Sequence, residues 1–493
     1  GIFIIPQSIV FHKNRYYIRR NKPRNCSKGV KNGVFFYSVM PKIVRLSEFQ
    51  YEIPIFIINK DFDCFYDQFL KTDLGKIYLS TPFSELSQSF KLKDSKKGTH
   101  CYFSPKGKIA LMMLKNYYGC SDKKLIELLN GNIFMQFFCD ILIPINQPLT
   151  NFKIVSQIRM ELSKSMNIRK SQEILTKTWI PYMKDLDKIF TDATCYESEV
   201  RFPTNQKLLW ECVQWNYKQI ESLCRILKIK LPRTKYLDWC RRYNEYSKKR
   251  KKQSKYRTKV TRGLLKLLYK LNGELSKIEN QNSFEATAKY KQQRAIVAKV
   301  YQQQAQIFKT GKSVPDRIVS ISKSYIRPIV RGKEVKQVEF GAKVNKIQID
   351  GINFIEHIQY RAFNEGTRLQ SSIFCAQNLT KTKVKMLGAD AIYATNKNRT
   401  FTTSNNIQTD FVRKGKAGKN EEQRKILAKE IKKERATRLE GSFGKEKEHY
   451  NLRKIKAKTQ KSEILWIFFG IHTANALEIG KRIYNSQFKS LVA

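Results

Sequence analysis

The hydrophobic pattern of this chain changes its period near residue 314, and that change restricts the class of fold it can adopt. Between residues 235 and 310 the pattern is helical and very polar. From Val314 onward apolar residues recur at every second position, which is typical of strands with one buried face. A chain with long segments of both kinds is neither all helical nor all β.

The segment after residue 314 predicts a hairpin followed by alternating helices and strands. Asp350-Gly351 is a strong turn sequence between two strand-like runs. The predicted strands cover 186–191, 318–321, 338–344, 346–349, 354–358, 384–389 and 407–412, and helices are expected over about 365–378 and 420–448. The predicted fold class is therefore α/β, with a mixed sheet whose first strand is separated from the others by a long and mostly helical insertion.

Residues 104–142 predict a helical domain before the sheet. Gly119 is a typical helix stop, and Ser121 is a typical N-cap for the helix that follows. The short break between these two helices fits a DNA-binding helix-turn-helix and also an ordinary helical domain. The pattern leaves both interpretations open.

The charge of the chain indicates an acidic partner. It carries 94 Lys and Arg against 42 Asp and Glu, a formal net charge of +52. Nucleic acid fits best, because dispersed Lys and Arg bind phosphates with release of counterions. Residues 241–270 hold 13 of the cations and one acid, Glu245, with tyrosines between them. This segment fits a surface for the DNA backbone and also a solvated helical face.

The cysteines and histidines argue against a zinc site. The ten cysteines are scattered without a CxxC pair, and the five histidines are dispersed. We therefore expect reduced thiols in a cytoplasmic protein. No apolar run approaches the roughly 18 residues that a membrane span requires, so no membrane partner is expected.

Three carboxylates far apart in the sequence stand in contexts that suit a metal-dependent phosphodiester site. Asp192 and Asp390 each follow an apolar strand-like run, and Glu440 borders the apolar stripe of a charged helix. Ligands of open α/β sheets gather at the carboxyl ends of strands, and Mg²⁺ prefers carboxylate oxygens. Three such groups on rigid elements can hold two Mg²⁺ ions, which stabilise the attacking and the leaving oxygen of the reaction.

Other acids and histidines nearby are expected to have different roles. Asp350 is favoured by turn geometry alone and is assigned to the hairpin. Glu356 and Glu365 are expected to support the site from behind the three carboxylates. His357 and His449 are expected to pack or to contact phosphate, not to bind a metal.

With these contexts in place, the chain resembles insertion-sequence transposases of the DDE class, which have a ribonuclease H-like catalytic domain. The resemblance covers most of residues 104–485 and depends on a combination of motifs. These are Thr-Asp-Ala-Thr at 191–194, Arg-Phe-Pro-Thr at 201–204, Ile-Arg-Pro-Ile-Val-Arg-Gly-Lys at 326–333, Gly-Ala-Asp-Ala-Ile-Tyr-Ala-Thr-Asn-Lys-Asn-Arg at 388–399, Arg-Ala-Thr-Arg-Leu-Glu-Gly-Ser-Phe-Gly at 435–444 and Trp-Ile-Phe-Phe-Gly-Ile-His-Thr-Ala-Asn at 466–475.

The resemblance implies that Asp192, Asp390 and Glu440 are the catalytic and metal-binding triad, with two Mg²⁺ ions that Mn²⁺ can replace. The implied reaction is hydrolysis at the transposon ends, which frees a 3′-OH, followed by transfer of that 3′-OH into target DNA. The implied partners are double-stranded DNA, as terminal inverted repeats and as target, and a second copy of the chain when two ends are synapsed.

The neighbourhood of the glutamate departs from the family pattern. Many relatives carry Tyr-x2-Arg-x3-Glu-x6-Lys there. Lys447 fits the lysine slot, whereas Ala436 takes the arginine slot and Lys433 the tyrosine slot. Arg435 or Arg438 would then supply the arginine.

The residues implied to contact DNA include this lysine, these two arginines and a basic loop, which is also compatible with an ordinary exposed turn. They are Lys447, Arg435, Arg438, Arg413, Lys414, Lys416 and Lys419.

The implied organisation has five parts. They are an upstream or non-native leader (1–39), an N-terminal helical domain for binding DNA ends (40–150), the first part of the catalytic domain (180–204), a basic helical insertion (205–313) and the remainder of the catalytic domain (314–485). The expected location is the bacterial cytoplasm, in association with the nucleoid. A domesticated or inactive relative that only binds DNA, and an unrelated basic nuclease, are the alternatives.

Overall fold

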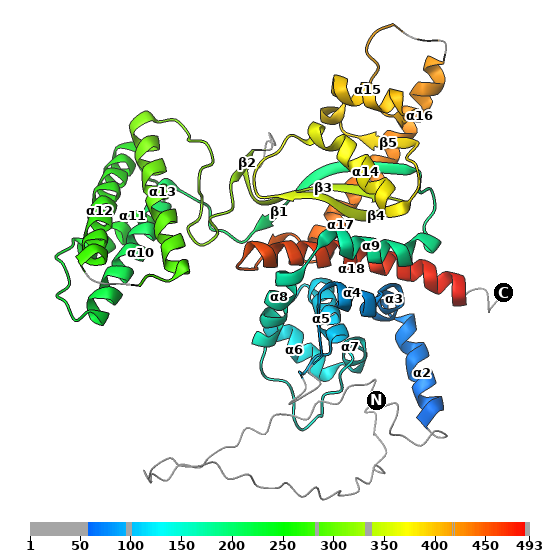
Figure 1. Cartoon of the computed structure of the whole chain (residues 1–493), viewed down its shortest axis with the longest axis horizontal. Helices are drawn as coiled ribbons and strands as arrows, with labels where there is room; N and C mark the ends of the chain where they lie inside the picture. The colour runs from blue at the N-terminus through cyan, green and yellow to red at the C-terminus, as the bar shows by residue number, and fades with distance from the viewer. Residues whose placement is uncertain are drawn as a thin grey trace, which may run out of the picture. The chain divides into compact units, whose positions relative to one another are not determined.

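The computed structural model describes residues 58–94, 101–281, 285–330, 338–416, 418 and 420–488 (Figure 1). The expected leader over 1–39, the segment 331–333 and Lys419 lie outside these residues. The described part is a mixed α/β structure in which helices predominate. Its nine cysteines are free thiols, and none of the helices within these ranges is long and apolar enough to cross a membrane.

One mixed sheet organises the chain from residue 188 onward. Its strands are β1 (Lys188–Ser198), β2 (Pro328–Val330), β3 (Val338–Ile349), β4 (Ile352–Gln359), β5 (Met386–Ala389), β6 (Gln408–Thr409) and β7 (Lys454–Ile455). The order β4-β3-β1-β5-β6 runs across the sheet, with β2 on β3 and β7 on β1. The pairs β4-β3 and β3-β1 are antiparallel, whereas β1-β5 and β5-β6 are parallel. Strand β1 therefore joins a hairpin to a parallel half of the sheet.

The hairpin between β3 and β4 confirms the turn predicted from Asp350-Gly351. Both residues have positive φ, 48° and 80°, which a two-residue hairpin turn of this kind requires. The Asp350 carboxylate is held there by the backbone N–H of Lys184 and by the Arg482 guanidinium. The turn and these contacts explain why an aspartate occupies position 350.

One large core joins the sheet to nine helices, which come before the first strand or at the C-terminal end of the described chain. They are α2 (Ile58–Lys71), α3 (Asp73–Ser80), α4 (Phe83–Ser89), α5 (Pro105–Tyr118), α6 (Asp122–Gly131), α7 (Ile133–Phe138), α8 (Lys153–Ser165), α9 (Ile168–Trp179) and α18 (Gln460–Phe488). Helix α18 contacts β4 on one side and α3, α5 and α8 on the other (Figure 1). The predicted signals hold: Gly119 ends α5 at φ 61°, and the Ser121 side chain caps α6.

Four helices between β1 and β2 have a separate core. They are α10 (Asn205–Ile226), α11 (Tyr236–Lys248), α12 (Ser254–Gln281) and α13 (Ala288–Thr310). The strand predicted over 318–321 is wrong, because this segment is irregular. Its backbone is satisfied by glutamine side chains of α13: Gln303 accepts from the N–H of Ile318, and Gln293 donates to the carbonyl of Ile321.

The remaining α-helices and 3₁₀ turns include several that contact strands of the sheet. They are α14 (Leu369–Thr380), α15 (Asn396–Ser404), α16 (Glu421–Glu434) and α17 (Gly441–His449), with the 3₁₀ turns η1 (Ile180–Tyr182), η2 (Glu365–Arg368) and η3 (Ala391–Tyr393). Between α16 and α17 the backbone forms a π-helical turn, η4 (Arg435–Glu440). The single helix predicted over 420–448 is thus continuous but contains one wide turn.

Candidate active site

Asp192 and Asp390 lie side by side on neighbouring parallel strands. The last paired residues of β1 and β5 are Thr191 and Ala389, so the two aspartates follow at the same level. Asp390 comes directly after β5, as predicted. The prediction that the first strand ends at residue 191 is wrong: Asp192 lies inside β1, because β3 continues to pair with β1 as far as Glu197.

The helix that carries Glu440 covers the face of the sheet on which both aspartates lie. Phe190 and Gly388 precede the aspartates by two positions and therefore share their face. Phe190 packs against Ile431 and Leu439 of the α16–η4 segment. A Cβ on Gly388 would lie 2.5 Å from the Phe190 ring and 2.8 Å from Ile431, so this glycine permits the close approach of the helix.

The π-helical turn brings Arg435 to Glu440. A π-helix closes over five residues instead of four, so Arg435 occupies the position that Ala436 would have in a regular α-helix. Its Nη1 is 3.5 Å from Glu440 Oε1. Arg438, the other candidate, is half exposed and lies 3.9 Å from Asp350. Arg435 is therefore the arginine beside the glutamate.

Burial disfavours the ionised form of the Asp192 carboxylate. It raises the pKa of Asp192 from 3.8 to about 6, and the charges of Glu365 and Asp390 add to the increase. The backbone N–H of Ala193 and the Arg435 guanidinium act in the opposite direction. A carboxylate that lies near two other acids is suited to bind a cation.

Asp410 belongs to the same cluster and was not identified from the sequence. It follows β6, is 4 % exposed and accepts a hydrogen bond from the backbone N–H of Ala389. Its Oδ2 is 4.0 Å from Arg435 Nε, which has no hydrogen-bond partner among the described residues. The strand predicted over 407–412 is too long: β6 ends at Thr409, so Asp410, which was expected inside that strand, directly follows β6.

The donor chemistry of Asp192 and Asp390 fits a hard divalent cation. In the part of the chain that the structure describes, however, no three acid, histidine or cysteine side chains lie close enough to hold one ion together. The Glu440 carboxylate is half exposed and pairs with Arg435. Two ligands of the expected triad are adjacent, and the third lies on the helix packed over the same face.

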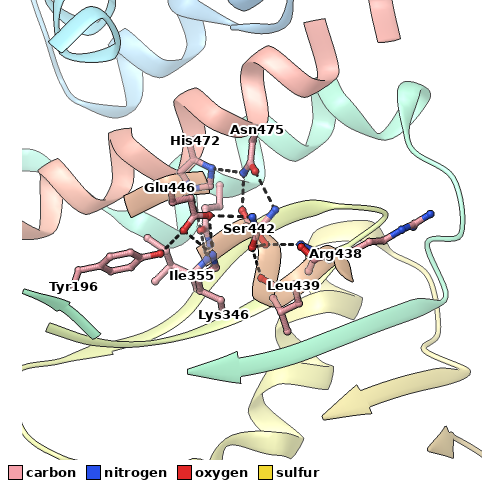
Figure 2. A network of polar contacts seen from close by, with 12 residues as sticks. Tyr196, Lys346, Ile355, Arg438, Leu439, Ser442, Glu446, His472 and Asn475 are labelled. Atoms are coloured by element: carbon pink, nitrogen blue, oxygen red, sulfur yellow. Dashed lines mark hydrogen bonds and ion pairs between the residues drawn. The ribbon is translucent and has the colours of Figure 1, made fainter. Parts of the chain in front are cut away.

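A buried polar network fastens the helix of Glu440 to the sheet (Figure 2). Lys346, the β3 residue paired with Asp192, is fully buried and lies 2.7 and 2.8 Å from the two carboxylate oxygens of Glu446 on α17. The hydroxyl of Tyr196 and the amide of Asn353 also donate to Glu446. Burial lowers the pKa of Lys346, and the Glu446 carboxylate offsets part of that effect.

The same network holds the π-helical turn. The Gln348 side chain on β3 donates to the backbone carbonyl of Arg438 at 3.2 Å and to the Asn353 side chain at 2.9 Å. The Ser442 hydroxyl lies 3.4 Å from that same Asn353 oxygen. The sheet therefore binds the helix at three successive points, Arg438, Ser442 and Glu446.

Two side-chain amides seal the edge strand β4 on the far side of this network. Gln172 of α9 pairs with both backbone groups of Ile355, and Asn475 of α18 pairs with both backbone groups of Asn353. The His472 ring lies between the two amides, 3.1 Å from each. These contacts satisfy the outward N–H and C=O groups that an edge strand otherwise exposes.

The other expected positions are distributed around the site. Glu365 pairs with Lys343, and Glu356 with Arg368. Lys447 lies on α17, 5.9 Å from the ring of Tyr196.

The basic loop lies before α16. Arg413 is 3.4 Å from Glu421, Lys414 donates to Asn396, and Lys416 is exposed. These side chains are outside the carboxylate cluster, and their expected contact with DNA stays a prediction.

Comparison of the chain with protein-family models, curated proteins and solved structures finds no match.

Proposed function

We propose that this protein is a DNA transposase of the DDE class that cleaves phosphodiester bonds at transposon ends and transfers the freed 3′-OH ends into target DNA. One observation carries the proposal: Asp192 and Asp390 directly follow the last paired residues of two neighbouring parallel strands, under a helix that carries Glu440. The strand order β4-β3-β1-β5-β6, antiparallel on one side of β1 and parallel on the other, supports a ribonuclease H-like catalytic domain.

Asp192, Asp390 and Glu440 would hold the divalent ions, which are Mg²⁺ with Mn²⁺ as a substitute. When bound, a pair of such ions activates water or a 3′-OH and neutralises charge on the phosphoryl group. Asp192 would lose its residual proton on binding, because a cation favours the ionised form. Arg435 pairs with Glu440 on the site face, and Asp410 lies 4.0 Å from Arg435 Nε. Lys447, seven residues after Glu440 on the same helix face, is suited to contact a phosphate.

The proposed partner is double-stranded DNA, first as the terminal inverted repeats and then as the target. The net charge of +52 supports a polyanionic partner. Synapsis of two ends would bring two copies of the chain together. We propose the bacterial cytoplasm, beside the nucleoid, as the location.

The test is cleavage and joining of DNA that carries the element's own inverted repeats, with and without Mg²⁺. We expect Asp192→Asn, Asp390→Asn and Glu440→Gln each to reduce turnover at least about 100-fold, because each removes a charged ligand of the metal ions that act on the reacting phosphate. Matched controls are Asp187→Asn, just before β1, and Glu448→Gln, an exposed acid of α17. Both controls should cut like the parent.

Two outcomes would count against this assignment. If the three variants cut as well as the parent, the triad is wrong. If the parent binds the repeats but never cuts with either metal, the chain is a DNA-binding derivative of a transposase. The pairing of Glu440 with Arg435 is the observation that favours this second function.

A further inference from the structure

Helix α12 carries a straight row of cations on its exposed side. Lys255, Lys259, Arg262, Lys266 and Lys270 follow one another at intervals of three or four residues, and all five are exposed. At 100° per residue they occupy an arc of about 80°, and at 1.5 Å per residue they extend over about 22 Å. We call these five residues the α12 ridge.

The opposite side of α12 is fixed in the core of the four helices. Leu264, Leu268, Leu271 and Leu275 are fully buried there. The ridge therefore cannot turn inward, and α12 has no spare apolar face that could insert into a lipid surface. Its cations are displayed to solvent by the same packing that stabilises the helix.

Within the described residues, no carboxylate neutralises the ridge. None of its five side chains forms an ion pair; Lys270 donates to the backbone carbonyl of Arg233, and Arg262 lies over the ring of Phe308. The chain just before α12 adds five consecutive exposed cations, residues 248–252. Exposed surfaces usually mix charges of both signs, so this surface is suited to bind a polyanion.

Three tyrosines that precede or begin the ridge do not serve as stacking platforms. Tyr246 is 4 % exposed and packs between Tyr243 and Tyr256, with ring centroids 6.1 and 5.6 Å away. Tyr243 itself stacks on Trp210 at 4.7 Å. Recognition of single strands depends on exposed aromatic rings that bases can stack on. These three rings pack against other side chains of the protein. Tyr269 of α12 is 68 % exposed, but it is a single ring beside a ridge of five cations, which favours a duplex over a single strand.

We propose that the α12 ridge binds the phosphate backbone of double-stranded DNA without reading its sequence. A straight row of cations matches a stiff duplex, which presents about one phosphate charge per 1.7 Å of its axis. The choice of DNA over other duplexes rests on the proposed transposase function. The ridge would hold the DNA that flanks the site of cutting, and so add affinity but no sequence preference.

The experiment compares two fivefold Lys/Arg→Gln variants of the full chain. The ridge variant changes Lys255, Lys259, Arg262, Lys266 and Lys270. The control changes five exposed lysines of the same helical region that form no row: Lys230, Lys289, Lys291, Lys309 and Lys312. Both lose the same charge, so bulk electrostatics is matched. Binding of a random-sequence DNA duplex is measured from about 50 to 300 mM salt.

We expect the ridge variant to bind at least about tenfold more weakly at 150 mM salt, and its slope of log K against log salt to be less steep by about 4. The control should keep most of the parental slope. Equal losses in the two variants, or an unchanged slope in the ridge variant, would overturn the proposal. So would tighter ridge-dependent binding to duplex RNA, or to vesicles with anionic lipid, than to duplex DNA.

The result is separable from the proposed function. Mg²⁺-dependent cleavage of a short repeat duplex at low salt should survive in the ridge variant, because the ridge lies outside the carboxylate cluster. If the parent never cuts DNA, the proposed function fails, whereas the comparison of slopes still decides whether the ridge binds the duplex.

Discussion

The surroundings of Asp192 disfavour the ionised form of its carboxylate, and this should make the stability of the protein depend on pH. Its pKa of about 6 in the folded chain lies above the usual 3.8, mainly because of burial. The folded state therefore holds a proton that the unfolded state has lost between about pH 4 and 6. Stability falls as the pH rises through that window and stays lower above it.

We therefore expect Asp192→Asn to stabilise the metal-free protein at pH 7.5 by about 1–3 kcal/mol and to change little at pH 4.5. Adding Mg²⁺ at pH 7.5 should raise the unfolding temperature of the parent and not that of the variant. Thermal unfolding at the two pH values measures both effects. A variant that is less stable than the parent at pH 7.5 would show that Asp192 has a purely structural role.

At the scale of the element, the helix from α16 to α17 owes its position to buried polar contacts as much as to its apolar stripe. Lys346 and Glu446 form an ion pair with exposures of 0 % and 1 %. A second buried pair, Lys323 with Glu463, has exposures of 8 % and 0 % and also receives a hydroxyl from β1, that of Ser198. Only the first pair is attached to the helix of Glu440.

This contrast provides a matched experiment. Lys346→Met alone and Lys323→Met alone should each lower the free energy of unfolding by roughly 3–5 kcal/mol, because each leaves a buried carboxylate unpaired. The double variants Lys346→Met/Glu446→Leu and Lys323→Met/Glu463→Leu should recover part of that loss, because they remove both charges of the pair. Urea unfolding measures these costs. Only the first double variant should also weaken the stabilisation by Mg²⁺, because it frees Glu440 from the sheet. Equal Mg²⁺ responses in the two double variants would refute a positioning role.

At the scale of the whole molecule, three distant parts of the chain meet at His472. It lies between Gln172 of α9 and Asn475 of α18, whose amides seal β4. Burial, with the nearby charge of Lys346, lowers the pKa of His472 from 6.5 to about 3. Protonation would also turn Nδ1 into a donor that faces the Asn475 amide, which already donates.

The unfolded chain binds a proton at His472 between pH 3 and 6.5, and the folded chain does not. This contribution to stability is complete above about pH 6.5 and decreases as the pH falls. Between pH 7.5 and 5.0 we expect a loss of about 2 kcal/mol from this residue. Urea unfolding at the two pH values should show it, and His472→Gln should reduce the difference. An unchanged difference in the variant would show that other groups carry the pH dependence.

The sequence by itself determined the mixed sheet, the hairpin at Asp350-Gly351, the helical block between the first and second strands, and the placement of Asp390 at a strand end. These features follow from local periodicity and turn chemistry, which neighbouring residues fix. The triad and its reaction came from resemblance and stay a proposal.

Only the tertiary structure decided which arginine reaches Glu440, that Asp410 joins the cluster, and that Lys346 and Glu446 are buried together. Each of these depends on pairing between segments far apart in the sequence. A π-helical turn shifts the register by one residue, and its Arg438 carbonyl is bonded by Gln348 of a distant strand. The ridge on α12 is visible in the sequence as charge, but only the packing of the opposite face shows that it is displayed to solvent.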